Sequence, residues 1–410
     1  MTSPVQHPAR LYFLDWVRIL AFFVLILYHV GMYYVTWDWH VKSPHAGTGA
    51  EPFMQLSSPW RIGLLFFIGG AGASLLLARQ RPAAFLRRRS LRLLVPLLFG
   101  MLVIVPPQPY LEVVEKLGYA DGYGAFMRLY LSGYGGFCRE DCLTLPTWNH
   151  LWFVAYLWVY TVLLGACIGL LGPRFDALAA STFRLLRGWR IIAVPAALLA
   201  GARVLMVEHF PTTHALVDDW YNHAMCFIPF VLGALVARTP GFWVRLEPLR
   251  WPALGMALTG WAAMQVWQAL PEGVLGAQAA ILLRPVMYAV HALLAWSAMV
   301  AACGFARRHL NHDGPARRYL NEAVFPVYIV HQTLIVVMAH ALQPVRMAPG
   351  LEALVLVALT ATLSFALFEI VRRVRVLRAL FGLAPQGVAA APSLHRAGSC
   401  PGPVQQHTAG

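Results

Sequence analysis

The sequence predicts an all-α integral membrane protein, a polytopic bundle of about ten transmembrane helices with both termini in the cytoplasm. Of the 410 residues, 59% are hydrophobic and only 12% are charged. The mean hydropathy is +0.59, and this composition does not suit a soluble enzyme of such length. Apolar runs of about 20 residues also recur along the chain, and each is long enough to cross a hydrocarbon core of about 30 Å.

Ten apolar runs are the predicted transmembrane helices. The first is too long, and too rich in Tyr, Trp and charged residues, for a cleaved signal peptide. Together they make one transmembrane domain over residues 1–383, and residues 384–410, rich in Pro, Gly, Ala and Ser, are expected to form a disordered cytoplasmic tail. The expected spans are residues 14–36, 60–79, 91–107, 149–172, 190–208, 223–238, 250–270, 280–304, 322–342 and 351–372.

The basic residues predict how these spans are oriented. With the N-terminus in the cytoplasm, 24 of the 32 Lys and Arg residues fall on the inner side and six on the outer side. Acidic residues lie mostly in the outer loops. The net charge of +14 therefore reflects membrane topology, and no nucleic-acid partner is expected. The outer six are Lys42, Arg61, Lys116, Arg128, Arg139 and Arg346.

The cysteines predict no metal site. Cys138 and Cys142 lie in the longest outer loop, residues 107–148, where they form either a disulfide in an oxidising compartment or two free thiols. The others fall in the spans or in the tail, so they form no cluster with metal-ligand spacing.

Arg18 and His29, eleven residues apart in the first span, are the first candidates for chemistry. On a helix they are roughly 16 Å apart and within about 20° of the same face. His29 is then a general base near mid-membrane, Arg18 holds an anion at the cytoplasmic edge, and Asp15, one turn earlier, orients Arg18. In the alternative interpretation Arg18 only snorkels and His29 hydrogen-bonds a neighbouring helix.

Arg89 and Arg92 lie one turn apart at the inner end of the third span. They share a helix face, so one interpretation is that they bind phosphate beside Arg18. In the other, they are basic residues that only mark the cytoplasmic side of the membrane.

Six motifs in order resemble the membrane-bound type-3 acyltransferase family, above all its glucan biosynthesis protein C branch. The resemblance covers about residues 10–375. The motifs are YFLDWVR with His29 eleven residues beyond its Arg, WHVKS (39–43), FFIGG (66–70), R-x-x-R-x-x-x-P (89–96), HLWFV (150–154) and FPVYIVHQ (325–332).

The resemblance implies a membrane-embedded O-acyltransferase of the bacterial inner membrane. It would move a succinyl or acetyl group from cytoplasmic acyl-CoA, a co-substrate and not a bound cofactor, to hydroxyls of a cell-envelope glycan. Arg18 and His29 match the family's essential pair, and Arg89 and Arg92 match its R-x-x-R motif, with Arg88 beside them as a further acyl-CoA-binding residue. Transfer is direct or passes through an acyl-His intermediate.

The segment HLWFVAYL (150–157) departs from another branch of the family. It carries no acidic residue where the O-antigen-acetylating branch has Trp-Ser-x-x-x-Glu, so the substrates of that branch are not implied.

The remaining polar residues of the spans are candidates for binding the acceptor. Trp39 and His40 either contact sugar or anchor the membrane interface, and the same choice applies to His150. Arg284 either touches the acceptor or pairs with an acid such as Asp219. The family motif makes His331 a pocket residue.

A transporter of small anions, or an envelope-glycan flippase, is the alternative function. Buried Arg and His residues and acidic outer loops would suit a carrier, but such folds often show paired, broken spans in two halves. No such pseudo-symmetry is evident in this sequence, and the polar residues crowd into the first three spans. Whether the chain forms a homo-oligomer is left open.

Overall fold

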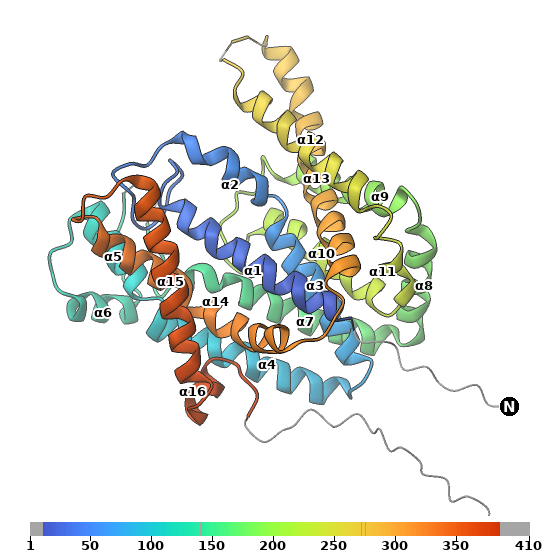
Figure 1. The fold of residues 1–410 in the computed structure, drawn as a ribbon, viewed down its shortest axis with the longest axis horizontal. Helices are drawn as coiled ribbons and strands as arrows, with labels where there is room; N and C mark the ends of the chain where they lie inside the picture. The colour runs from blue at the N-terminus through green and yellow to red at the C-terminus, as the bar shows by residue number, and fades with distance from the viewer. Residues whose placement is uncertain (1–10, 140–141, 272, 275, 386–410) are drawn as a thin grey trace, which may run out of the picture.

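The computed structural model describes residues 11–139, 142–271, 273–274 and 276–385, and these form a bundle of helices with no strand element (Figure 1). The predicted all-α class is confirmed. Apart from residues 384 and 385, the expected disordered tail lies outside the described residues.

The helices of the first half are α1 (Tyr12–Met32), α2 (Glu51–Ser57), α3 (Arg61–Leu77), α4 (Pro82–Phe99), α5 (Pro107–Leu117), α6 (Tyr123–Ser132), α7 (Trp152–Leu171) and α8 (Pro173–Leu185). Those of the second half are α9 (Arg190–Met206), α10 (Trp220–Ala237), α11 (Pro240–Val244), α12 (Arg250–Gln268), α13 (Ala277–His309), α14 (Pro315–Leu342), α15 (Pro349–Val371) and α16 (Arg375–Leu380). Short helical turns occur at η1 (Thr48–Ala50), η2 (Gly100–Ile104) and η3 (Asn149–Leu151).

Eight helical segments in the described part of the chain are long and apolar enough to cross a membrane, where the sequence predicted ten. The fifth expected span forms α9, which meets α8 at 111°; this bent pair makes a ninth segment if it counts as one span. The seventh forms α12, whose three Trp and two Gln lower its hydropathy. The eight are Tyr12–Met32, Thr48–Leu77, Pro82–Leu117, Asn149–Leu171, Trp220–Ala237, Ala277–His309, Pro315–Leu342 and Pro349–Val371.

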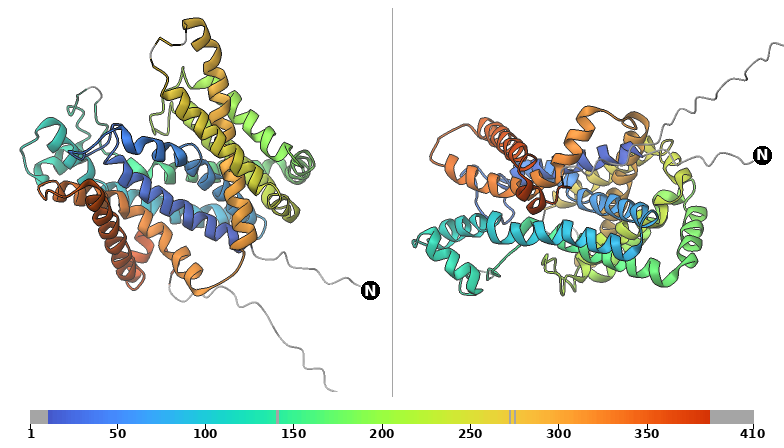
Figure 2. Two further views of the ribbon diagram at one scale, coloured as in Figure 1. Left: turned by 45° about the horizontal axis from the view of Figure 1, so that its top comes forward. Right: turned by 90° about the horizontal axis from the view of Figure 1, so that it is seen from below.

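Helix α1 lies in the middle of the bundle and packs against α14, α13 and α3 (Figures 1 and 2). Its residues Phe13, Val17, Ala21 and Leu25 recur every fourth position and are all buried. The helix is unbroken from Tyr12 to Met32. The predicted separation of roughly 16 Å between Arg18 and His29 is therefore kept, with the arginine near the start of the helix and the histidine near its end.

Helices α3 and α10 approach each other closely at two reciprocal glycines. A Cβ atom on Gly70 would lie 1.9 Å from the carbonyl oxygen of Phe230, and one on Gly233 would lie 2.0 Å from that of Phe67. Small residues at such positions let two membrane helices pack backbone against backbone. This crossing fixes α3, and hence the residue that begins it, relative to the rest of the bundle.

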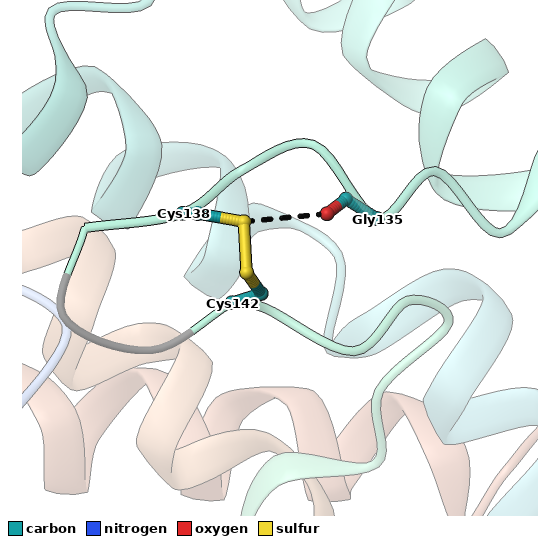
Figure 3. The surroundings of a disulfide bond; sticks show 3 residues. All are labelled: Gly135, Cys138 and Cys142. Carbon is teal, nitrogen blue, oxygen red and sulfur yellow. Dashed lines mark hydrogen bonds between the residues drawn. A yellow bond between two sulfur atoms is a disulfide. The ribbon is translucent and has the colours of Figure 1, made fainter.

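Cys138 and Cys142 are joined by a disulfide in the loop after α6 (Figure 3). Of the two alternatives that the sequence left open, the structure has the cross-link. The Sγ atom of Cys138 also lies 3.4 Å from the carbonyl oxygen of Gly135. Cys167, Cys226 and Cys303 are free thiols.

Candidate active site

A cavity of about 650 Å³ lies beside the end of α1 that carries His29. Its walls come from α1, the segment after it, the start of α3, η3, the start of α7, α9, the loop before α10, α10 itself, α13 and α14. Its lining is rich in ionisable side chains. Among them are His29, His40, Arg61, His150 and His214.

His29 on α1 is held by His331 on α14. The Nδ1 atom of His29 lies 2.8 Å from Nε2 of His331, and the two rings are stacked with their centres 5.0 Å apart. On its other side, His331 Nδ1 lies 2.6 Å from the carbonyl oxygen of Tyr328. His331 is completely buried, whereas His29 lines the cavity. His331 is therefore placed behind His29 and not in the pocket wall.

These contacts fix the positions of the protons when both imidazoles are neutral. The carbonyl of Tyr328 only accepts, so Nδ1 of His331 donates to it and Nε2 of His331 carries a lone pair. That lone pair accepts from Nδ1 of His29. The Nε2 atom of His29 is then the unprotonated nitrogen, which is the form that a general base requires.

His150 lies against the same pair from η3. Its ring centre is 5.1 Å from that of His331, and its Nε2 donates to the carbonyl oxygen of Ile329 at 3.1 Å. The Nδ1 atom of His150 is buried without a hydrogen-bond partner. His150 also lines the cavity, so the structure places it in the pocket and not only at a membrane interface.

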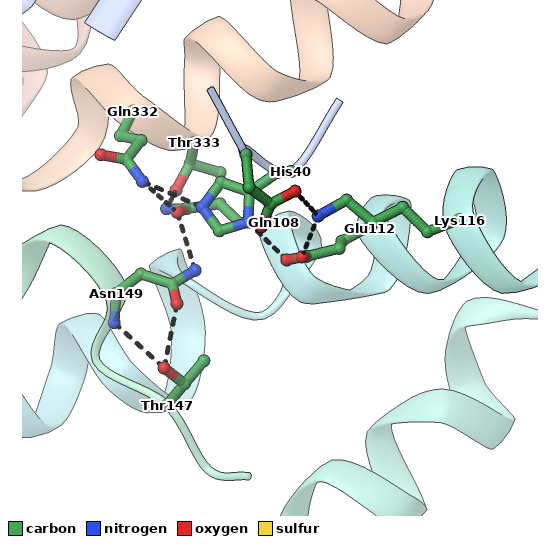
Figure 4. A network of polar contacts seen from close by, with 9 residues as sticks. His40, Gln108, Glu112, Lys116, Thr147, Asn149, Gln332 and Thr333 are labelled. Atoms are coloured by element: carbon green, nitrogen blue, oxygen red, sulfur yellow. Dashed lines mark hydrogen bonds and ion pairs between the residues drawn. The ribbon is translucent and has the colours of Figure 1, made fainter. Parts of the chain in front are cut away.

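His40 belongs to a polar network that closes one side of the cavity (Figure 4). Its Nδ1 donates to Glu112 at 2.6 Å, and its Nε2 accepts from Gln332 at 3.1 Å. Glu112 is itself paired with Lys116 at 2.8 Å. The sequence reasoning missed Glu112 as the partner of His40, although Gln332 ends one of the quoted motifs. The network continues through Gln108, Thr147, Asn149 and Thr333.

Trp39, the other residue of this segment that was predicted to bind the acceptor, is largely buried and also lines the cavity.

Arg284 does not line the cavity. It forms an exposed ion pair with Glu208 at 3.2 Å, and Tyr288 donates to the same carboxylate at 3.0 Å. The hydrogen bonds from Arg284 and Tyr288 lower the pKa of Glu208. Of the two alternatives for Arg284, pairing with an acid is the one present, and the acid is Glu208 instead of Asp219.

Arg61, which the sequence placed only by its charge, begins α3 and lines the cavity. Its guanidinium carbon lies 3.3 Å from the centre of the Tyr28 ring. Burial lowers the pKa of His214; Asp219 opposes that shift, and the positive charge of Arg61 adds to it. A charge count along the sequence gave no indication that this arginine is inside the pocket.

At the opposite end of α1, Arg18 is oriented by Asn321 and not mainly by Asp15. Its Nη2 donates to the side-chain oxygen of Asn321, while its closest approach to Asp15 is 3.9 Å. Asp15 is instead hydrogen-bonded by Arg317, which also binds Asp313 at 2.7 Å. The hydrogen bonds from Arg317 lower the pKa of Asp313. The sequence reasoning missed both Arg317 and Asn321.

The predicted arginine cluster forms around Arg18. Arg89 and Arg92 lie within electrostatic range of it, as their one-turn spacing on α4 allows. The Nε atoms of Arg18 and Arg89 are buried without hydrogen-bond partners. Arg92 donates from Nε to the carbonyl oxygen of Gly382 at 2.9 Å. Arg88 is exposed on the same helix.

No group of three or more His, Cys, Asp or Glu side chains in the described ranges is arranged to hold a metal ion. The arrangement is one of acid–base and anion-binding groups. A base nitrogen with a defined lone pair faces a cavity at one end of α1, and cationic donors gather at the other end.

Comparisons with known proteins show the family of the chain. The sequence model of a family described as acyltransferase domain matches residues 11–369. Glucans biosynthesis protein C of Escherichia coli (strain K12) is 25% identical over 154 residues, which is 38% of this chain and 38% of that protein. The same protein of Escherichia coli (strain SMS-3-5 / SECEC) matches to the same extent. The aligned stretch is thus well under half of these relatives. No solved structure matches the chain.

The match to the family extends from the first residues of α1 almost to the end of α15, and so includes Arg18, His29, the R-x-x-R segment and His331. The chain belongs to the type-3 acyltransferase family, and it is a multi-pass membrane acyltransferase.

Proposed function

We propose that the protein is an acyl-CoA-dependent O-acyltransferase of the bacterial inner membrane that modifies hydroxyls of a cell-envelope glycan, with succinyl or acetyl as the transferred group. The observation that carries the proposal is the hydrogen bond from His29 to His331, which leaves Nε2 of His29 unprotonated at the cavity. The acceptor class is supported by the distant likeness to glucans biosynthesis protein C.

In the proposed step, Nε2 of His29 takes the proton of an acceptor hydroxyl as its oxygen attacks the thioester carbonyl. The carbon–sulfur bond breaks, and the imidazolium returns the proton to the leaving thiolate. While His29 is charged, its Nδ1–H bond to His331 becomes a charge-assisted hydrogen bond, which is stronger than a neutral one. His331 thus acts on the reaction through His29, as the third residue of a catalytic triad does.

The arginine cluster supports the proposed donor. Acyl-CoA is polyanionic at its nucleotide end, and guanidinium groups bind phosphate through paired N–H donors. Arg18 and Arg89 each retain a buried Nε donor without a partner. The pantetheine arm would then run beside α1 over the roughly 16 Å that separates Arg18 from His29.

The test is transfer of radiolabel from acyl-CoA to gluco-oligosaccharides by purified protein in liposomes. The wild type is expected to transfer label, and the His29→Ala variant to lose at least about 100-fold in rate. Equal transfer by the wild type and His29→Ala would contradict the role of His29. Movement of small anions into the liposomes without any acyl donor would favour the transporter instead.

A further inference from the structure

One wall of the cavity is formed by the loop before α10, which carries His214. His214 and His29 line the same cavity, and Arg61 lies within electrostatic range of both. His214 is an exposed residue, and no other residue in the described part of the chain hydrogen-bonds its imidazole nitrogens. The ring is therefore open to a ligand in the cavity.

The charge state of His214 suits an uncharged ligand. Desolvation by the surrounding protein lowers its pKa from 6.5, and Asp219 opposes this shift only in part. The imidazole is thus neutral at pH 7, with one nitrogen that donates a hydrogen bond and one that accepts. A hydroxyl group also both donates and accepts, so it is complementary to this ring.

The backbone of His214 is held on both sides. Its N–H donates to Asp219 at 3.1 Å, and its carbonyl oxygen accepts from Nε1 of Trp148 at 3.0 Å. The φ angle of His214 is 56°, in the left-handed region that residues other than glycine seldom adopt. Such a conformation persists only where the surrounding structure fixes it. These contacts therefore hold His214 in place at the cavity wall.

Asp219 is the centre of this arrangement. Its side chain is completely buried at the start of α10. Its Oδ1 accepts from the backbone N–H of Thr213 at 3.0 Å, and its Oδ2 accepts from the hydroxyl of Tyr156 and from Nδ2 of Asn222 at 2.8 Å. With the N–H of His214, these donors fill the four acceptor positions of a carboxylate. A buried carboxylate that is fully satisfied in this way makes the loop rigid.

Trp152 gives the same wall an apolar surface beside His214. The centres of the two rings are 4.6 Å apart, with 35° between their planes. Trp152 also lines the cavity. A wall with one aromatic ring and one neutral donor and acceptor matches a ligand that carries hydroxyl groups around an apolar C–H face, and a sugar ring is such a ligand.

The position of the loop favours the acceptor over the donor. In the proposed function, acyl-CoA extends along α1 from Arg18 to His29. His214 lines the cavity at the His29 end of that path, where the acceptor hydroxyl meets Nε2 of His29. A group bound by His214 therefore lies beyond the thioester and not beside the CoA arm.

We propose that His214 binds hydroxyls of the sugar acceptor next to Trp152, and that Asp219 is the positioning residue that holds His214 in the cavity. This inference rests on the proposed acyltransferase function and deepens it. The hydrogen bonds orient the sugar so that another of its hydroxyls reaches Nε2 of His29. His214 takes no proton of the reaction, so its loss weakens acceptor binding and leaves the chemical step intact.

The experiment measures steady-state transfer of radiolabel from succinyl-CoA and from acetyl-CoA to a gluco-oligosaccharide, by the full-length protein in liposomes. Glycine removes the imidazole and tolerates the left-handed backbone at position 214. In His214→Gly, the KM for the oligosaccharide should rise at least about tenfold. The kcat and the KM for acyl-CoA should stay within about twofold, which also shows that the variant folds. His209→Gly removes another exposed histidine between α9 and α10, and this matched control should behave as the wild type.

Asp219→Asn tests the positioning role, because it replaces one accepting oxygen with an amide that donates. It should also raise the KM for the oligosaccharide. Added to His214→Gly, it should change that KM less than about twofold further, because Asp219 acts through His214. A double variant in which the two increases multiply would give Asp219 a role of its own and overturn the positioning role.

The remaining outcomes separate this inference from the proposed function. An unchanged KM for the oligosaccharide in His214→Gly would assign His214 to packing of the wall, and a fall in kcat alone would assign it to the chemical step. Either result overturns the inference and leaves the proposed function standing. A wild type that transfers label from neither acyl-CoA would contradict the proposed function itself.

Discussion

His331 on α14 accepts a hydrogen bond from His29 on α1, across 302 positions of sequence. The carbonyl of Tyr328 holds the proton of His331 on the side away from His29. Two neutral imidazoles and one backbone carbonyl thus form a chain of hydrogen bonds that allows a single arrangement of protons. In that arrangement, Nε2 of His29 carries a lone pair. A helix-to-helix contact sets the state of the proposed base.

Replacing His331, which accepts the hydrogen bond from His29, should lower kcat without weakening the binding of acyl-CoA. In His331→Ala, Nδ1 of His29 loses its partner, and the imidazole is free to carry its proton on Nε2. We expect kcat to fall about 100-fold with little change in the KM for acyl-CoA. His331→Gln, whose amide oxygen replaces the accepting nitrogen, should recover part of the rate.

His209→Ala is the matched control for this series, because His209 is an exposed histidine in the loop after α9. It should behave as the wild type. A His331→Gln variant as inactive as His331→Ala, or a large increase in KM for both, would argue that His331 only supports packing.

Removing a positive charge from the cluster of Arg18, Arg89 and Arg92 should weaken the binding of acyl-CoA. Arg89→Gln and Arg92→Gln each remove a guanidinium close to Arg18, and we expect the KM for acyl-CoA to rise about tenfold in each, with a weaker effect on kcat. Arg87→Gln, two positions before Arg89 and exposed, is the control. Steady-state rates at several acyl-CoA concentrations check this. A fall in kcat alone would place the cluster outside the donor site.

The separation and common face of Arg18 and His29 were predictable because both follow from helix geometry once α1 is continuous. The arginine cluster was predictable for a similar reason, since Arg89 and Arg92 are one turn apart. The partners were not predictable. Asn321 reaches Arg18 from α14, far along the chain, and no spacing rule connects the two.

Counting charges along the sequence gave the least information on where the side chains of Arg61 and Arg284 lie. Both are single basic residues near outer or apolar segments, yet Arg61 is buried in the cavity and Arg284 is exposed beside Glu208. The difference comes from how α3 and α13 pack, which hydropathy does not encode. Likewise α12 was expected as a span, but with its three Trp and two Gln it is not among the segments apolar enough to cross a membrane.

The α3–α10 crossing gives a stability prediction with a control two residues away. A Cβ on Gly70 meets the backbone of Phe230 at 1.9 Å, whereas one on Gly72 meets nothing within 4 Å. Gly70→Ala is expected to destabilise the protein by about 1–3 kcal/mol, because the helices must move apart. Gly72→Ala should be neutral or slightly stabilising. Thermal unfolding in detergent measures both, and equal unfolding temperatures would contradict the close crossing.

Lys42 gives a prediction on pH. Its Nζ donates to the carbonyl oxygens of Met32 and Val35, each at 2.7 Å, where the chain leaves α1. Burial lowers the pKa of Lys42 from 10.5 to about 8. Between these values the folded protein binds fewer protons at this site than the unfolded chain, so the contribution of Lys42 to the free energy of unfolding increases as the pH rises from about 8 to about 10.5.

Lys42→Met removes this titration. The apparent unfolding temperature of the wild type should therefore gain on that of Lys42→Met as the pH rises through this window, and the difference should be constant below about pH 7, where the amine is protonated in both states. Arg128→Gln serves as the control for loss of an outer positive charge, because arginine does not titrate in this range. Parallel curves for the wild type and Lys42→Met across the window would mean that the pKa of Lys42 is the same in the folded protein and in the unfolded chain.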